Sequence, residues 1–191
     1  NALRAHVGCG FEGVGDIAKA KSEIYQGLNA DGLALIPCED ANATVFQTAS
    51  KAFKQHTFGV GQGDIHAGNI VLQPLSCAFD LVRGGERAAV LLPVPGKHNI
   101  HNAVAAAALA LAAGLRLQEV SDGLQSFANI KGRLQIKSGI KNAVVLDDTY
   151  NANPDSMKAA LDVLAGLPAP RVFVMGDIGE LGEDESAAMH A

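Results

Sequence analysis

Two short segments carry the polar side chains best suited to hold a ligand. In the segment 96–114, His98, Asn99 and Asn102 precede an alanine-rich run that predicts a buried helix over 102–113. A helix N-terminus favours anions, and imidazole and amide groups can pair with the edge of a nucleobase. The same pattern also fits a simpler role, in which Asn99 or Asn102 caps the helix and His98 is a loop residue.

The second segment is DDTYNANPD, residues 147–155. Its two acids end a predicted strand over 144–148, where they could hold a pair of ribose hydroxyls, orient an amine, or simply start a turn. Asn153 and Pro154 are good N-cap and first-turn residues for a helix over 155–164. This loop is therefore a candidate for ligand binding and for helix capping at once.

Lys21 is a further candidate because of its place in a predicted helix over 14–28. Helical spacing puts it on the same face as Ile17, Ile24 and Leu28. A lysine on an apolar stripe often extends its amine to solvent, which is the simpler explanation. Desolvation there would instead lower the pKa of the amine and make it nucleophilic.

The elements around these segments predict an α/β fold. Helix and strand alternate at first, which favours a parallel sheet; the expected elements are 14–28, 33–37, 45–54 and 57–60. Extended runs follow and predict a small antiparallel sheet, with a Gly84-Gly85 hairpin between the last two; the runs are 69–75, 78–83 and 87–94. Helices over 102–113 and 117–127 come next.

A domain boundary is predicted over 130–134, where the helices stop. A strand over 144–148, a helix over 155–164 and a strand over 171–175 would form a right-handed parallel unit. Its carboxyl edge would carry Asp147, Asp148, Gly176 and Asp177, and such edges bind ligands in open α/β sheets. Arg133 at the boundary could reach a phosphate across the cleft, although a lone arginine is more often a surface group.

Composition and charge limit the kinds of partner that the chain is expected to bind. The 191 residues carry a net charge of −5 with a pI near 5.6, so there is no general attraction for nucleic acid or anionic lipid. Three cysteines at unrelated spacings suit reduced thiols in a cytosolic protein. The longest apolar stretch, 103–115, is too short to span a bilayer. The chain has no start methionine or signal peptide, and both ends are interpreted as cuts.

Five segments, in order and spacing, resemble the Mur ligase family. They are HVGCGFEGVGDIAKAKSEIYQGL, LLPVPGKHNIHNAVAAAALALAAG, KGRLQ, VLDDTYNANPDSM and VMGDIGELGE, which together run from residue 6 to 183. YNANP and GDIGELG resemble the MurF-type branch in particular. The resemblance implies a three-domain protein, in which residues 1–134 are the later part of the central ATP-binding domain. Residues 135–191 would begin the Rossmann-like C-terminal domain.

The resemblance also implies an activity and its partners. Enzymes of this kind transfer the γ-phosphate of ATP, with Mg²⁺, to the terminal carboxylate of UDP-N-acetylmuramoyl-tripeptide. The amine of D-alanyl-D-alanine then attacks the acyl phosphate, which expels phosphate instead of oxide. Such an enzyme works in the cytoplasm in cell-wall precursor synthesis and is expected to be a monomer, with no nucleic-acid partner and no membrane insertion.

Residue roles follow from the same resemblance. Lys21 is similar to the lysine that is carbamylated and assists magnesium, and His6 to the metal-ligand histidine, although Val7 and Gly8 replace the family's usual leucine and acid. The other implied roles are the adenine side for His98, Asn99 and Asn102, the interdomain nucleotide contact for Arg133, the ribose or phosphates for Asp148, and the substrate side for Tyr150, Asn151 and Asn153.

One departure from the family pattern bears on activity. The chain contains no Gly-x-x-Gly-Lys-[Ser/Thr] loop, which is the family's main phosphate cradle and is expected upstream of Asn1. The chain alone is therefore predicted to be inactive. Two alternatives stay open: a sibling amide ligase, either another Mur ligase or a folylpolyglutamate-synthase-like enzyme, and a non-catalytic nucleotide-binding module.

Overall fold

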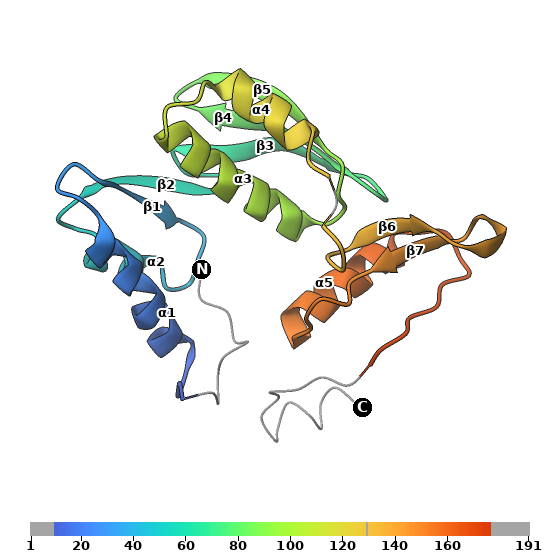
Figure 1. Cartoon of the computed structure of the whole chain (residues 1–191). Coiled ribbons are helices and arrows are strands. Elements are labelled where there is room, and N and C mark those ends of the chain that lie inside the picture. Colours follow the sequence, from blue (N-terminus) through green and yellow to red (C-terminus); the bar gives the residue numbers. More distant parts are fainter. Residues whose placement is uncertain (1–9, 129, 177–191) are drawn as a thin grey trace.

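The computed structural model of the protein describes residues 10–128 and 130–176. Its main body is a five-stranded sheet in the order β1-β2-β3-β4-β5 (Figure 1). The first three strands pair in parallel and the last three in antiparallel fashion. The strands are β1 (Leu33–Pro37), β2 (Lys54–Val60), β3 (Ile65–Leu72), β4 (Cys77–Arg83) and β5 (Glu86–Leu92).

Helices cover both faces of this sheet, as the alternating burial of β1 demonstrates. Ala34 and Ile36 belong to a core shared with α1 (Val14–Ser22) and α2 (Ala43–Ala49). Leu35, which points the other way, packs against the larger core. That core lies beneath α3 (Lys97–Ala112) and α4 (Leu117–Gln125), which rest on the opposite face (Figure 1). The predicted α/β fold is confirmed.

The parallel and antiparallel parts form one continuous sheet, because β3 pairs with β2 on one side and with β4 on the other. Only residues 61–64 join β2 to β3. Gly61 and Gly63 make this short return possible with φ values of 95° and 108°, which favour glycine. β3 therefore begins at Ile65 and not at 69, and Asn69 lies instead in an irregular stretch of the β3–β4 pairing.

The predicted hairpin between β4 and β5 is confirmed. Arg83 pairs with Glu86, and the two residues between them are Gly84 and Gly85. Both adopt positive φ, 54° and 92°, as a two-residue turn that matches strand twist requires. This is the part of the fold in which local sequence dictates geometry most directly.

A second, smaller unit follows α4 and packs beside the start of α3 (Figure 1). It contains the antiparallel pair β6 (Gln135–Ser138) and β7 (Val144–Asp147), joined through a 3-10 turn at Ile140–Asn142. α5 (Pro154–Ala165) comes next, with Asn153 as its N-cap, as predicted. This unit positions the segment 147–155 against the larger sheet domain.

The predicted strand over 171–175 is not formed. Residues 171–176 have no regular structure, and the side chains of Val172 and Val174 are 79% and 86% exposed. A strand needs a neighbour for its N–H and C=O groups, and among the described strands β7 pairs with β6 alone. Gly176 therefore lies at no sheet edge, while Asp177 falls outside the described residues. In the described ranges, no helix is long and apolar enough to cross a membrane.

Candidate functional site at the start of helix α3

The first two turns of α3 carry three of the predicted site residues. The helix begins directly after Gly96, which is its N-cap and adopts φ 93°. It therefore starts earlier than the predicted residue 102, and His98, Asn99 and Asn102 lie within it. Neither asparagine is the N-cap, so the simpler explanation of their presence as caps is wrong. No side chain caps this helix start.

The two asparagines form a short chain of hydrogen bonds. The Asn99 Nδ2 donates to the carbonyl oxygen of Pro95 at 2.7 Å, and the Asn102 Nδ2 lies 3.5 Å from the Asn99 Oδ1. Asn99 is thus engaged with the turn before the helix. The Asn102 Oδ1 accepts no hydrogen bond from the described residues, so it remains available as an acceptor.

Close packing joins the start of α3 to α5. A Cβ on Gly96 would lie 2.5 Å from the His98 Cε1 and 3.2 Å from the Val163 Cγ2. Real Cβ atoms do not approach that closely, so only glycine fits between the imidazole ring and α5, and its positive φ adds to the requirement. Gly96 therefore lets the smaller unit dock against the ring of His98.

The electrostatic surroundings of His98 favour its neutral form. Burial is the largest influence and lowers the pKa of the imidazole below 6.5; the Asp148 carboxylate raises this pKa, and His101 lowers it further. A neutral imidazole has one nitrogen that donates and one that accepts. His98 at neutral pH can therefore pair with the mixed donor and acceptor edge of a base.

A second contact holds residues 132–134 against the end of β7. The backbone N–H of Tyr150 donates to the Gly132 carbonyl at 3.0 Å, and the N–H of Leu134 donates to the Asp148 Oδ1 at 3.0 Å. These two bonds flank Arg133. The predicted interdomain arginine, Arg133, and the predicted acid, Asp148, thus lie at one contact between residues 132–134 and 148–150, which we call the joint.

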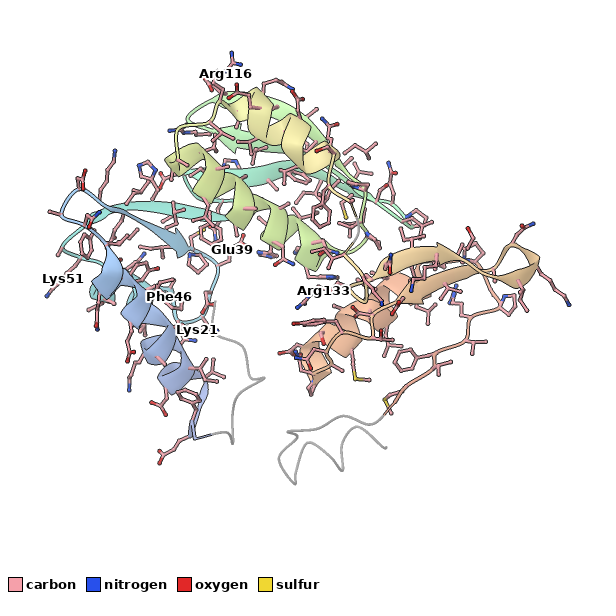
Figure 2. All side chains as sticks on the ribbon, in the orientation of Figure 1. Lys21, Glu39, Phe46, Lys51, Arg116 and Arg133 are labelled. Atoms are coloured by element: carbon pink, nitrogen blue, oxygen red, sulfur yellow. The ribbon has the colours of Figure 1, made fainter. Side chains whose placement is uncertain are left out.

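Arg133 stacks on the ring of Tyr150, with 4.1 Å from its Cζ to the ring centroid. This geometry is a cation–π contact, which orients the guanidinium plane. The Arg133 side chain makes no hydrogen bond or ion pair with the described residues, so its donors are free for an anion. Figure 2 shows Arg133 where the smaller unit meets the start of α3.

The two adjacent acids at the end of β7 differ in what they contact. Hydrogen bonds from the Lys137 ammonium and the Thr149 hydroxyl lower the pKa of Asp147 to about 2. Asp147 is therefore committed to its own hairpin. Asp148 uses one oxygen for Leu134 and acts electrostatically on His98, so it is the acid that faces the joint.

Asn153 is occupied by its capping role. Its Oδ1 accepts from the Ser156 N–H at 2.9 Å, and its own N–H donates to the Ser156 Oγ at 3.0 Å. Asn151 is exposed, and its Oδ1 accepts from the N–H of Ala152. Tyr150 is 67% exposed beside them. Tyr150 thus lies at the joint, where it contacts Arg133, whereas Asn153 caps α5.

Lys21 does not lie on a buried face, contrary to the expectation from spacing. α1 ends at Ser22 and is followed by a 3-10 helix, so the α-helical spacing that would align Lys21 with Ile24 does not continue. Ile24 is 75% exposed, and Lys21 is exposed too. Only Ile17 of the predicted stripe is deeply buried. Figure 2 shows Lys21 on α1, apart from Arg133. His6 lies outside the described residues.

Glu39 and His101 were not among the predicted site residues, although His101 lies on α3 and Glu39 contacts it. The Glu39 Oε2 lies 3.8 Å from the His101 Nε2 and accepts the N–H of Val60 at 2.9 Å. Figure 2 shows Glu39 between the end of β1 and α3. A glutamate directly after the carboxyl end of a parallel strand was the available signal, since ligand sites gather at that edge.

The comparisons with known proteins agree with this arrangement. The Mur ligase middle domain family matches residues 1–110, and the Mur ligase, glutamate ligase domain family matches residues 132–191. The chain belongs to the Mur ligase family. The second match begins at residue 132, next to Arg133, and residues 111–131 lie between the two matches.

Individual Mur ligases are similar over the whole chain. The UDP-N-acetylmuramoyl-tripeptide–D-alanyl-D-alanine ligases of Haemophilus influenzae and Escherichia coli are each 39% identical to it. The chain is fully covered in both cases but spans only 41% and 42% of those relatives. A crystal structure of MurF from Acinetobacter baumannii has a TM-score of 0.92 and 41% identity, covering all of this chain and 41% of that one.

The donor groups at the joint fit a nucleotide better than they fit a metal ion. Imidazole, amide, carboxylate and guanidinium groups together can serve a base, a ribose and a phosphate; here they are His98, Asn102, Asp148 and Arg133. Within residues 10–128 and 130–176, no group of three or more histidine, cysteine, aspartate or glutamate side chains could hold a metal ion. The chemistry of these four groups therefore fits the parts of a nucleotide.

Proposed function

We propose that this chain forms the nucleotide side of a MurF-type ligase, which uses ATP to join UDP-N-acetylmuramoyl-tripeptide to D-alanyl-D-alanine. The observation that carries the proposal is the convergence of His98, Arg133 and Asp148 at one joint between the two units. The similarity of the whole chain to two ligases of that name supports it.

The proposed roles follow from the chemistry of each group. His98 and Asn102 offer both donors and acceptors for the adenine edge, and Asn99 holds the turn that presents them. Asp148 accepts from a ribose hydroxyl with the oxygen that Leu134 does not use. Arg133, kept flat by the ring of Tyr150, donates to a phosphate oxygen.

ATP supplies the phosphoryl group that turns the tripeptide carboxylate into an acyl phosphate with a good leaving group. The residues of this chain bind and orient the nucleotide. We place the substrate side at the exposed part of the 150–153 loop, with Tyr150 and Asn151 as contact residues and Asn153 as the residue that fixes the loop to α5.

Mg²⁺ remains part of the proposal through His6 and Lys21. His6 would be a metal ligand, and Lys21 would be a carbamylated lysine that assists Mg²⁺. The exposure of Lys21 leaves its amine accessible to carbon dioxide. Mass spectrometry of the intact protein in bicarbonate buffer tests this, because carbamylation adds a carbon dioxide mass that a Lys21→Arg variant would not acquire.

Domain organisation and location complete the proposal. Residues 1–134 would be the later part of the central ATP-binding domain and residues 135–191 the start of the C-terminal domain; the start of the second family match at residue 132 supports this division. The enzyme would be a cytoplasmic monomer. Its partners would be the two substrates, without nucleic acid or a membrane.

The decisive test is ligation by a chimera, in which this chain replaces the segment that it matches in the Escherichia coli ligase. We expect ATP-dependent product with D-alanyl-D-alanine and at least about 100-fold less with L-alanine or glutamate, because binding pockets reject amines that leave their polar groups unpaired. The chain alone should give no product. A chimera that folds and prefers glutamate or L-alanine would contradict the MurF-type assignment and favour a sibling ligase.

A further inference from the structure

Glu39 connects the sheet to the start of α3 through a single carboxylate oxygen. Its Oε2 accepts the backbone N–H of Val60 at 2.9 Å, which ties it to the end of β2. The same oxygen lies 3.8 Å from the His101 Nε2 on α3. One atom therefore contacts two elements that come from distant parts of the sequence.

The local backbone makes room for this carboxylate. A Cβ on Gly59 would lie 3.2 Å from the Glu39 Cδ, 2.8 Å from the Cys38 Sγ and 2.9 Å from the Gln62 carbonyl oxygen. Any side chain at this position would displace Glu39 or the turn beside it. The glycine thus allows Glu39 to reach Val60 and hold a fixed position, which an ordinary surface glutamate does not have.

His101 lies three residues after His98, so both project from the same side of α3. Electrostatic contacts continue from there, since His98 interacts with both His101 and Asp148. A row of four groups, Glu39, His101, His98 and Asp148, thus runs from the end of β1 to the end of β7. This row passes the candidate nucleotide site at the start of α3.

We propose that Glu39 and His101 are positioning residues that hold the first turns of α3 at a fixed place over the carboxyl ends of β1 and β2. They set where His98 and Asn102 meet the base. The proposal rests on the proposed nucleotide role of that helix start. Because both residues act on the helix start that would hold the base, their loss is expected to weaken nucleotide affinity and to leave the chemical step unchanged.

The alternative is a partly exposed contact with no role, which is an ion pair only when His101 is protonated, since such pairs contribute little to stability. Steady-state kinetics of the chimera separates the two. Glu39→Gln keeps an acceptor for Val60 but removes the charge, and His101→Asn removes the imidazole. We expect each to raise the KM for ATP about 3- to 10-fold, with kcat and the KM for D-alanyl-D-alanine unchanged within about twofold.

The double variant is the sharper measurement. If the two residues act through each other, Glu39→Gln with His101→Asn raises the KM for ATP no more than the larger single effect. Glu86→Gln, an exposed glutamate on β5, is the matched control and should leave the KM for ATP unchanged. Single variants with an unchanged KM, or effects that multiply in the double variant, would overturn the proposal.

A second measurement uses this chain alone and needs no ligation. In ¹⁵N correlation spectra, Glu39→Gln should shift the amide signals of residues 97–102 more than Glu86→Gln does. Equal, negligible shifts in both would refute the contact itself. An inactive chimera together with clear shifts would count against the proposed ligase and leave the helix contact supported, so the two failures are distinguishable.

Discussion

The starts of α3 and α5 look equally suited to ligand binding in the sequence, yet the structure treats them differently. At α5, Asn153 and Ser156 satisfy each other's backbone N–H groups in a reciprocal capping box. At α3, Gly96 provides no side chain, and Asn99 turns back to Pro95. The start of α5 is therefore closed by its own residues, and the start of α3 has no side-chain cap.

The difference teaches that a polar loop before a helix has two uses that exclude each other. The N–H groups of the first turn can bond to a capping side chain, or they remain for water, a nearby carbonyl or a ligand. Asn153 takes the first use. At α3, a glycine cap brings the neighbouring unit close and leaves His98 near Asp148, with Asn102 one turn further along the same side of the helix.

Removal of the Asp148 carboxylate should have the largest effect on the open site. Asp148→Ala loses the bond to Leu134, the charge near His98 and the proposed ribose contact. We expect kcat/KM for ATP in the chimera to fall by about 100-fold or more, as for lost positioning groups. Asp147→Ala is the matched control, because that carboxylate bonds to Lys137 and Thr149. In this variant, kcat/KM for ATP should fall far less. Equal losses would show that the two acids are not distinguished as the structure indicates.

Arg133 offers the next largest effect. Arg133→Lys keeps the charge but loses the planar stack on Tyr150 and the paired donors. We expect kcat/KM to fall about 10-fold in Arg133→Lys and further in Arg133→Ala, since charged hydrogen bonds contribute about 1.5 to 3 kcal/mol. The nearby Lys131→Ala, exposed and on the same turn, is the control. Full activity of Arg133→Ala would show that this arginine has no role in the site.

Asn153 tests the closed helix start, where stability and not binding should change. Asn153→Ala should lower the free energy of unfolding by about 1 kcal/mol, the usual value of an N-cap. Asn153→Ser should recover most of it, because serine also caps. Urea denaturation of this chain measures both. An increase in the KM for ATP without a change in stability would mean that this helix start binds ligand after all.

The smallest expected effect concerns pH and His98. Its pKa in the folded chain lies below the ordinary 6.5, mainly through burial, so the unfolded chain takes up the proton first as the pH falls. This histidine therefore lowers the free energy of unfolding below about pH 6.5 and has no such effect above it. Denaturation at pH 7.5 and 5.5 should show that the free energy of unfolding falls less on acidification in His98→Asn than in the parent. An equal loss in both would contradict the burial of this ring.

Local patterns predicted those elements whose geometry depends on near neighbours. The Gly84-Gly85 turn and the Asn153-Pro154 helix start are both present as expected, since each needs only a few adjacent residues. The predicted strand over 171–175 depended on a partner, and the described residues supply none. The apolar character of those residues indicated a strand without indicating what would pair with it.

The site divides in the same way. The sequence named His98, Arg133 and Asp148 as candidates because they lie at a helix start, a domain boundary and a strand end, and their roles stay predictions. It placed Lys21 on an apolar stripe by extending one helical period to 28, whereas the helix ends at Ser22. It also missed Glu39, whose partners Val60 and His101 lie 21 and 62 positions away in the sequence.

By itself, the sequence determined the α/β class, the Gly84-Gly85 turn, the N-cap of α5 and the family. Those properties follow from composition, period and short motifs. Only the tertiary structure decided which polar residues face each other, because contacts between Glu39 and His101, or between His98 and Asp148, depend on how the sheet, α3 and the smaller unit pack. Packing brings distant residues together through the burial of apolar faces, and no local pattern along the chain encodes that distance.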